Sequence, residues 1–325
     1  MLTLGVLLVG LSTARSPAAE SYALIVAGDP GRPVTAAANT LGDWSANFSR
    51  WSAAWETLLI GTYQFPEAHV TCLSSPDPSS PGSISPETSR ADRGTVLAQI
   101  ASVARRATSQ DQVVLILIGH GYHSGVSGHF CLAGVDLTDS DLSQALSTVH
   151  CRELVILLLA PDLRDMVHAL SGAGRVIILG NVRSSAPYFS EFLLRALAPG
   201  AVTLLQAFNQ ASLDTIHWYQ NQQWLKDKHA WLVHGVVNQE VWRLVYPRGV
   251  MFAGDDQPHV AVTSNDPRQV AGILGRRMIA EVAGIDDNGD GEVSTVYDGG
   301  PVPAALTGAD GADGAVAATL TLGKP

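Results

Sequence analysis

Cysteines, basic residues and long apolar runs are all scarce in this sequence, and each shortage excludes a class of protein. Cys72, Cys131 and Cys151 are too few and too odd in number for a disulfide framework, and no pair has metal-ligand spacing, so buried structural thiols are expected. Twenty Lys and Arg against thirty Asp and Glu give a net charge of −10, which disfavours a nucleic-acid partner. No segment reaches the roughly 20 apolar residues of a membrane span.

Residues 1–19 are typical of an export signal, although the segment lacks a basic residue before its apolar part. Leu2 to Leu11 is apolar, and Ser16-Pro17-Ala18 supplies small residues at a cleavage site. A misplaced start and a buried first strand are the alternative interpretations. The mature chain is then expected to be soluble and exported, either periplasmic or extracellular.

Strand-like and helix-like segments alternate along most of the chain. The predicted strands are Tyr22–Ala27, His69–Leu73, Val113 to His120, Phe130–Ala133, Leu154–Ala160, Arg175–Leu179 and an edge strand at Ala315–Leu322. The predicted helices are Asp43–Ile60, a helix within Glu87–Thr108, Asp139–Leu146, Arg164–Leu170, Tyr188–Leu197, Thr203–Trp224 and Pro267–Ala283. This alternation predicts an α/β fold with a mainly parallel sheet and helices on both of its faces.

Bulky apolar side chains recur at helical spacing in the first predicted helix. They are Trp44, Phe48, Trp51, Trp55 and Leu58. A tryptophan stripe can form a ligand platform, but at this spacing we expect it to face the core.

Two of the predicted buried strands end in residues that bear on chemistry. The apolar run that begins at Val113 ends in Gly119-His120-Gly121, which places a histidine at the carboxyl edge of the sheet. Histidine suits general-base work, because its unperturbed pKa lies near neutrality. The next strand ends in Ala160-Pro161-Asp162-Leu163-Arg164, with no Cys, Ser or Thr to serve as a nucleophile.

These strand ends resemble those of the caspase-like α/β peptidases, specifically the legumain-type branch, in which one strand ends in His-Gly and the next in Ala-Cys. Phe130 to Thr138, F-C-L-A-G-V-D-L-T, is similar to the F-x-L-x-G-x-D-L-T run of bacterial members, and Gly174 to Ile178 is similar to the following strand. The resemblance covers Tyr22 to Leu232. It implies a caspase-like three-layer α/β/α sandwich over residues 20–232, followed by a C-terminal elaboration over residues 233–325.

The sequence departs from the family where the chemistry would occur. The resemblance places Pro161 at the position of the cysteine nucleophile, with Leu163-Arg164 where small residues follow. It places Pro30 at the position of an asparagine that steadies the histidine. His120 and Gly121 therefore remain as a vestigial base site, because Cys–His hydrolysis needs a thiolate within reach of the imidazole.

Other residues offer alternatives to the lost nucleophile. Cys151 stands at the amino end of its strand, roughly 30 Å from His120 at about 3.3 Å per residue. Cys131 is nearer but belongs to the short strand after the histidine. His120, His123 and His129 could form a metal site, yet no acidic or fourth ligand is evident, and solvated loop histidines are the simpler interpretation.

An acidic motif near the C-terminus matches the front half of a calcium-binding loop. Asp286, Asn288 and Asp290 occupy its first, third and fifth positions, and Glu292 supplies a backbone carbonyl. The acidic ligand expected at position twelve is replaced by Tyr297. The sequence therefore predicts either weak calcium binding or a solvated Asn-Gly turn.

Three functions stay open at this point. The first is an exported, catalytically inactive legumain-like module that binds an unknown protein or peptide partner. The second is a hydrolase with an unconventional nucleophile. The third is a calcium-stabilised structural module in which the fold is incidental to function.

Overall fold

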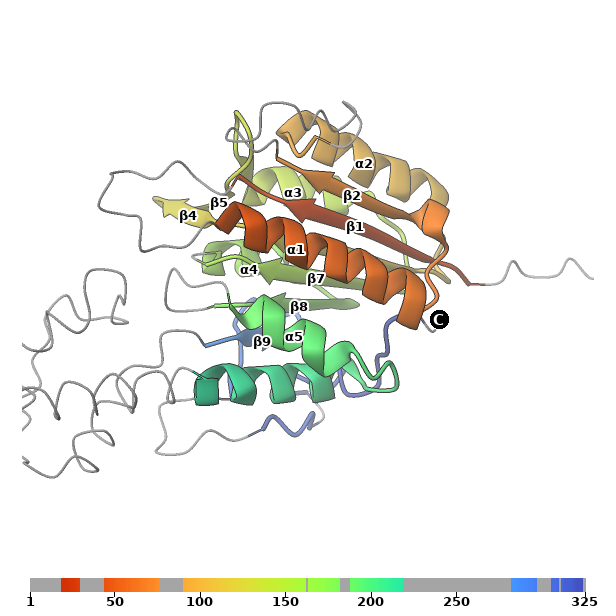
Figure 1. Cartoon of the computed structure of the whole chain (residues 1–325), viewed down its shortest axis with the longest axis vertical. Coiled ribbons are helices and arrows are strands. Elements are labelled where there is room, and N and C mark those ends of the chain that lie inside the picture. Colours follow the sequence, from red (N-terminus) through yellow and green to blue (C-terminus); the bar gives the residue numbers. More distant parts are fainter. Residues whose placement is uncertain are drawn as a thin grey trace, which may run out of the picture.

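The computed structural model describes residues 19–29, 44–75, 90–161, 163–181, 188–218, 282–296, 305–309 and 311–323. They form a mixed α/β structure around a six-stranded sheet that is flanked by helices (Figure 1). In spatial order the strands are β2 (Val70–Ser74), β1 (Ser21–Ala27), β3 (Gln112–Ile118), β7 (Glu153–Leu159), β8 (Arg175–Leu179) and β9 (Gly284–Asp286). Every neighbouring pair is parallel except β8 and β9, so the predicted mainly parallel α/β sheet is confirmed.

The central strands are continuous apolar runs because both of their faces are covered. Ile25 lies opposite Ile116, which lies opposite Leu157, and all three side chains are fully buried. Successive residues along each strand enter two different cores, one on each side of the sheet. A strand with a polar residue at every second position could not occupy this place.

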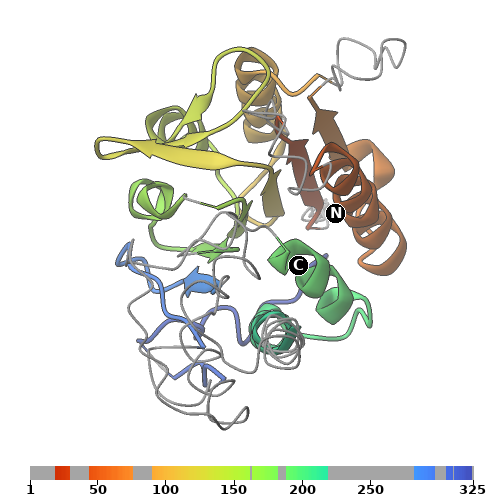
Figure 2. The same cartoon turned by 60° about the vertical axis from the view of Figure 1, so that its left-hand side comes forward.

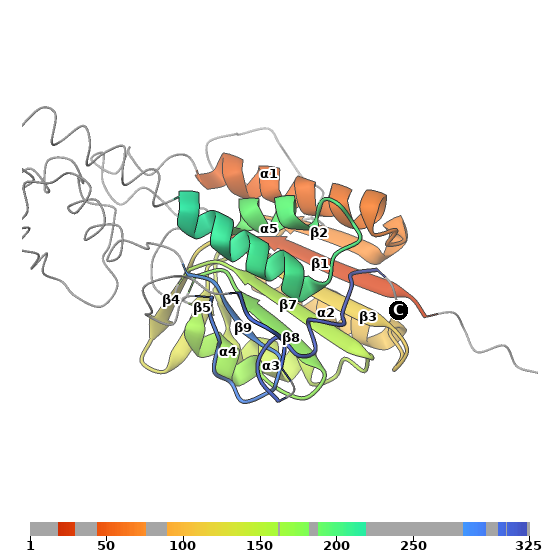
Figure 3. The same cartoon turned by 90° about the horizontal axis from the view of Figure 1, so that it is seen from below.

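Helices cover both faces of the sheet (Figure 3). One face carries α1 (Trp44–Thr57), α5 (Phe189–Leu197) and a helix over residues 204–218, and the other carries α2 (Arg93–Arg106), α3 (Asp139–Leu146) and α4 (Arg164–Leu170). A π-helical turn, η2 (Leu58–Thr62), extends α1, and a short 3₁₀ turn, η3 (Glu67–His69), precedes β2. Among the described residues, no helix is long and apolar enough to cross a membrane.

The tryptophan stripe of α1 faces the core, as its spacing predicts. Trp51 and Trp55 are 1% and 0% exposed, and Phe48 is 2% exposed. Their rings pack in the same core as α5 and one face of the sheet. The structure therefore confirms the packing role of Phe48, Trp51, Trp55 and Leu58, while the side chain of Trp44 lies outside the described part of the structure.

Side-chain caps fix the starts of two helices. Asp92 accepts a hydrogen bond from the backbone N–H of Thr95 at the start of α2. Thr138 and Asp141 form a reciprocal capping box at the start of α3, and Arg93 pairs with the Asp141 carboxylate at 2.8 Å between the two helices. Thr138 is thus the N-cap of α3.

The segment after His120 differs from its prediction. The segment where loop histidines were expected is a hairpin of β4 (Gly121–Ser124) and β5 (Ser127–Phe130), which joins β6 (Leu137–Thr138) in a small antiparallel sheet. The hairpin, drawn in yellow, extends away from the main sheet in Figure 2. Gly125 at φ 67° makes the two-residue turn, and the Gly- and His-rich composition hides the strand pattern. The strand predicted at Phe130–Ala133 is wrong beyond Phe130.

The C-terminal segment is also built differently. The predicted edge strand Ala315–Leu322 is wrong, because this segment forms turns. Its carbonyls at Ala317 and Leu320 accept from the backbone N–H groups of Leu205 (3.0 Å) and Leu204 (2.8 Å), which the helix over residues 204–218 leaves unbonded at its start. β9 was not predicted, and it adds the C-terminal region to the main sheet.

Several predictions fall outside the described residues. They are the export signal over residues 1–18, Pro30, the last residues of the helix predicted at Thr203–Trp224, Tyr297 and most of the helix predicted at Pro267–Ala283. Val282 and Ala283, at the end of that last segment, are described and are not helical.

Asp111 joins two segments at the amino edge of the sheet, the turn before β3 and the residue before β1. Its buried carboxylate accepts from the N–H of Glu20 (2.7 Å) and from the N–H and hydroxyl of Thr108 (2.7 and 2.9 Å). Burial would raise the pKa of Asp111, but these hydrogen bonds outweigh it and hold the pKa below its usual range. The ionised form is therefore the one that stabilises the fold.

Replacing Asp111 with Asn is expected to cost about 1.5–3 kcal/mol at pH 7, because the charged acceptor is lost. The stabilisation by Asp111 is present above the unfolded-state pKa of about 3.9 and is lost as pH falls toward the lower folded-state pKa. Urea unfolding of the parent and the Asp111→Asn variant should show that their difference in free energy of unfolding becomes smaller as the pH falls from 7 to about 3. A difference that is independent of pH would contradict the ionised role of Asp111.

Candidate functional site

β3 and β7 deliver their carboxyl ends to the same edge of the sheet. Ile118 lies opposite Leu159 in the parallel register, so His120 and Pro161, each two residues further on, lie at that edge together. A Cβ atom on Gly121 would lie 2.7 Å from the Pro161 carbonyl oxygen and would overlap the Leu163 side chain. The predicted proximity of His120 and Pro161 is therefore confirmed, and Gly121 is the residue that permits it.

His120 is held between the sheet and the hairpin that follows it. Its imidazole is partly buried and meets the Phe48 ring edge to face, with centroids 5.1 Å apart. Its carbonyl oxygen accepts from the Cys131 N–H at 2.9 Å. The Phe130 ring packs on Gly28 and Gly119, where added Cβ atoms would come within 2.8 and 3.0 Å of it. These contacts fix the backbone around the histidine.

The end of β7 carries no nucleophilic side chain at Pro161. Pro161 is buried, and the Leu163 side chain beside it is fully buried against Gly121. Proline offers neither a thiol nor a hydroxyl group, and the residues that follow fill the space with an aliphatic side chain. The end of β7 is therefore a packed strand edge, with an aliphatic side chain against Gly121.

None of the three thiols is activated. Burial, followed by the charges of Asp136 and Asp29, raises the pKa of Cys131 to about 12. Burial raises the pKa of Cys72 to about 12 and that of Cys151 to about 11. Since the thiolate is the nucleophilic form, all three behave as structural thiols, and all three are free of disulfide bonds.

The histidines after His120 do not gather into a metal site. His129 stacks on Tyr122 with ring centroids 4.7 Å apart, while His123 lies opposite Gly128 on the exposed strand. Adjacent residues of a strand face opposite sides, so His123 points away from the Tyr122–His129 pair. In the part of the chain that the structure describes, no three His, Cys, Asp or Glu side chains form a metal-ligand group.

The acidic motif forms a tight loop directly after β9. Asp286 Oδ1 accepts from the Gly289 N–H (3.1 Å), Asn288 Oδ1 from the Asp290 N–H (2.9 Å) and Asp290 Oδ1 from the Glu292 N–H (2.8 Å). Asp286 is 1% exposed, and its Oδ2 atom has no hydrogen-bond partner among the described residues. The Glu292 side chain turns outward and pairs with Arg164 at 3.0 Å.

Two further carboxylates join this loop to the C-terminal segment. Asp287 accepts from the N–H groups of Gly314 and Ala317, both at 2.7 Å. Asp313 accepts in return from the N–H groups of Asp287 (3.2 Å) and Ser294 (2.9 Å). Burial and the nearby Asp286 raise the pKa of Asp313, although its hydrogen bonds oppose the shift. Sequence analysis missed Asp313, whose only signal is an acid within a Gly- and Ala-rich tail.

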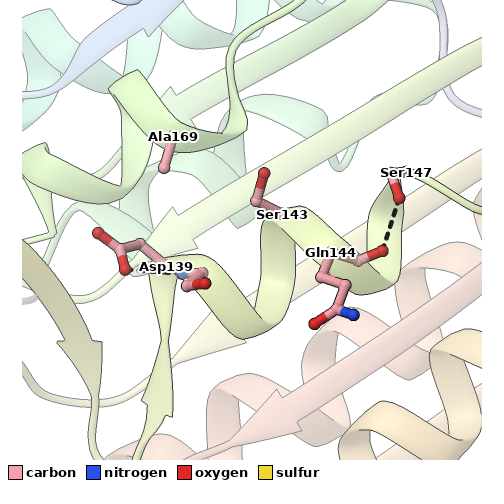
Figure 4. Close-up of a pocket in the computed structure, with 6 residues that line it drawn as sticks. Asp139, Ser143, Gln144, Ser147 and Ala169 are labelled. Carbon is pink, nitrogen blue, oxygen red and sulfur yellow. Dashed lines mark hydrogen bonds between the residues drawn. The ribbon is translucent and has the colours of Figure 1, made fainter.

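A surface hollow of about 590 Å³ lies between α3 and α4. Figure 4 shows Ser143 of α3 and Ala169 of α4 on its two sides. Its one carboxylate, Asp139, already accepts from the Ser127 hydroxyl (2.8 Å) and the Gly128 N–H (3.2 Å). The Ser147 hydroxyl bonds to the Gln144 carbonyl (2.7 Å), so the hollow presents small polar groups that are largely satisfied.

A groove of about 490 Å³ between α1 and α5 carries paired charges at its rim. Glu191 accepts from the Trp51 indole (2.8 Å) and pairs with Arg50 and Arg195, both at 2.9 Å. Burial would raise the pKa of Glu191, but these hydrogen bonds and charges hold it below its usual range. Glu191 therefore balances part of the positive charge of this groove.

No protein-family model matches this chain, and no curated protein sequence matches it. The fold and the strand edge define a mixed α/β protein with a mainly parallel sheet, in which a histidine and a buried proline end neighbouring strands.

Proposed function

We propose that this chain is an exported, legumain-like pseudopeptidase that serves as a binding or scaffold module for a protein or peptide partner. The proposal takes the caspase-like three-layer sandwich from the resemblance in sequence. The observation that carries it is the buried Pro161 at the end of β7, packed against Gly121 and beside His120. A base without a nucleophile leaves only the small residual catalysis of a binding site.

The local packing explains why one substitution would not restore a nucleophile. Leu163 lies fully buried against Gly121, where the family has small residues. A cysteine in place of Pro161 would therefore meet a filled strand edge, and the position of the orienting asparagine would still hold Pro30.

We expect the purified protein to show no turnover of peptides with Asn, Asp, Arg or Lys before the scissile bond. The rates of the parent, His120→Ala, Cys131→Ala and Pro161→Cys proteins should all equal the buffer blank, because Pro161 offers no nucleophilic atom and burial raises the pKa of all three cysteine thiols. Progress curves with fluorogenic peptides measure this directly, and circular dichroism verifies that each variant is folded.

The alternative is a hydrolase with an unconventional nucleophile. Turnover by the parent that disappears in the His120→Ala or Cys131→Ala variant would establish that alternative and overturn the proposal. Cys151→Ala is the matched control, because Cys151 precedes β7 at the opposite edge of the sheet.

A further inference from the structure

The loop after β9 contains a buried carboxylate oxygen to which no described residue donates a hydrogen bond. Asp286 is 1% exposed, Oδ1 bonds to the Gly289 N–H inside the loop, and Oδ2 of the same group has no hydrogen-bond partner among the described residues. Buried polar atoms are almost always hydrogen-bonded, and an ionised one left unpaired is costly. The free oxygen therefore points to a cation as the partner that completes the site.

The rest of the loop supplies ligands of the matching chemistry. Asn288 and Asp290 follow Asp286 at alternate positions, both are exposed, and each accepts a loop N–H through Oδ1. Asp290 Oδ2 also accepts from the Asn288 side-chain amide at 3.0 Å, so the two side chains already lie against each other. Gly289 and Gly291 adopt φ values of 84° and 81°, which lets the chain reverse around these side chains. Carboxylate, amide and carbonyl oxygens are ligands for hard divalent cations.

We propose that this loop binds one Ca²⁺ through side-chain oxygens of Asp286, Asn288 and Asp290 and the backbone carbonyl of Glu292, and that binding secures the C-terminal segment. The inference does not rest on the proposed pseudopeptidase, since the loop lies beyond β8 and β9 at one edge of the sheet.

Calcium fits these ligands better than magnesium. Four protein oxygens leave several positions to water, and Ca²⁺ accepts irregular six- to eight-fold coordination, whereas Mg²⁺ demands a near-ideal octahedron. With only two carboxylates and no bidentate acid at position twelve, the dissociation constant should lie at about 0.1–1 mM, the range of extracellular modules.

The coupling to the C-terminal segment passes through Asp287, which lies between two of the proposed ligands. Its carboxylate accepts from the N–H groups of Gly314 and Ala317. The Asp313 carboxylate in turn accepts from the N–H groups of Asp287 and Ser294. The backbones of Ile285 and Ser294 also bond to each other, with both N–H···O distances at 2.9 Å. A cation that fixes the loop therefore fixes the donors and acceptors that hold residues 311–317.

The test is calcium titration of the full chain by calorimetry, together with amide hydrogen exchange of residues 311–317. We expect binding at about 0.1–1 mM. Asp290→Asn removes one of the two carboxylate ligands and should weaken binding at least about tenfold, which is about 1.4 kcal/mol. The fold should be unharmed, because Asp290 is exposed. Asp286→Asn should weaken binding as well. Saturating calcium should slow exchange at Gly314 and Ala317 about tenfold or more, since opening of the segment must then break the loop.

Two further variants test the ligand set and the coupling separately. Glu292→Gln should bind calcium like the parent, because its side chain pairs with Arg164 and only its carbonyl is a ligand. Asp287→Ala should still bind calcium but lose the calcium-dependent slowing at Gly314 and Ala317. Absence of binding at about 10 mM calcium, or binding that Asp290→Asn leaves unchanged, would overturn the site. Binding without any effect on residues 311–317 would overturn the coupling.

Discussion

Replacing Gly121 with Ala is expected to destabilise the protein by about 3 kcal/mol or more, at the upper end of the cost of overpacking. The added Cβ would lie 2.7 Å from the Pro161 carbonyl oxygen and would overlap the Leu163 side chain. The Pro161 carbonyl belongs to the backbone just after the buried strand β7, so it cannot move without disturbing the β3–β7 edge. Urea unfolding followed by circular dichroism measures the loss.

The matched control is Gly61→Ala in the π-helical turn after α1. No atom lies within 4 Å of a Cβ there, so the change should be neutral or stabilising by up to about 1 kcal/mol. The Gly121→Ala/Leu163→Ala double variant should cost less than the sum of the single changes, because truncation of Leu163 removes one of the two clashes. Strict additivity would mean that the two strand ends do not pack as described.

Replacing Trp55 with Ala is expected to cost about 3–5 kcal/mol, the usual range for a buried tryptophan. Its side chain is fully buried between α1 and the sheet. Its indole nitrogen has no hydrogen-bond partner among the described residues, so the loss comes from packing alone. Equilibrium unfolding in urea gives the magnitude.

Comparison with Trp51 separates packing from hydrogen bonding. The Trp51 indole donates to Glu191 at 2.8 Å, whereas the Trp55 indole is a buried donor without a described partner. Trp51→Phe should therefore lower the free energy of unfolding by about 1–3 kcal/mol more than Trp55→Phe does. Ala53→Gln, on the exposed side of the same helix, should change stability by no more than about 0.5 kcal/mol. Equal costs for the two Phe variants would contradict this account of the Glu191 contact.

The sequence by itself determined the central strands, most helices and the position of His120 and Pro161 at the same edge of the sheet. Each depends on a local pattern. A strand buried on both faces must be apolar throughout, as β3 and β7 are, and a helix against the sheet must repeat its bulky residues every three or four positions, as α1 does. Parallel strands then bring their carboxyl ends to one edge, so the sequence is enough to pair the neighbouring strand ends.

The tertiary structure alone decided the hairpin after His120, the turns of the C-terminal segment and the addition of β9 to the sheet. β9 has only three residues, too few to carry an alternation, and it is fixed by pairing of Asp286 with Ile177 across more than a hundred residues of chain. The hairpin is stabilised by contact with α4, where a Cβ on Gly128 would lie 2.8 Å from the Met166 side chain.

The carboxylates Asp111, Asp287 and Asp313 lie beyond sequence reasoning for the same physical reason. Each accepts hydrogen bonds from backbone N–H groups of a segment that is distant along the chain, and one backbone N–H is chemically like any other. A local pattern can predict which side chains cap their own helix, as the Thr138–Asp141 capping box of α3 shows. Which distant loop an acid holds is decided only when the sheet has brought the two segments together.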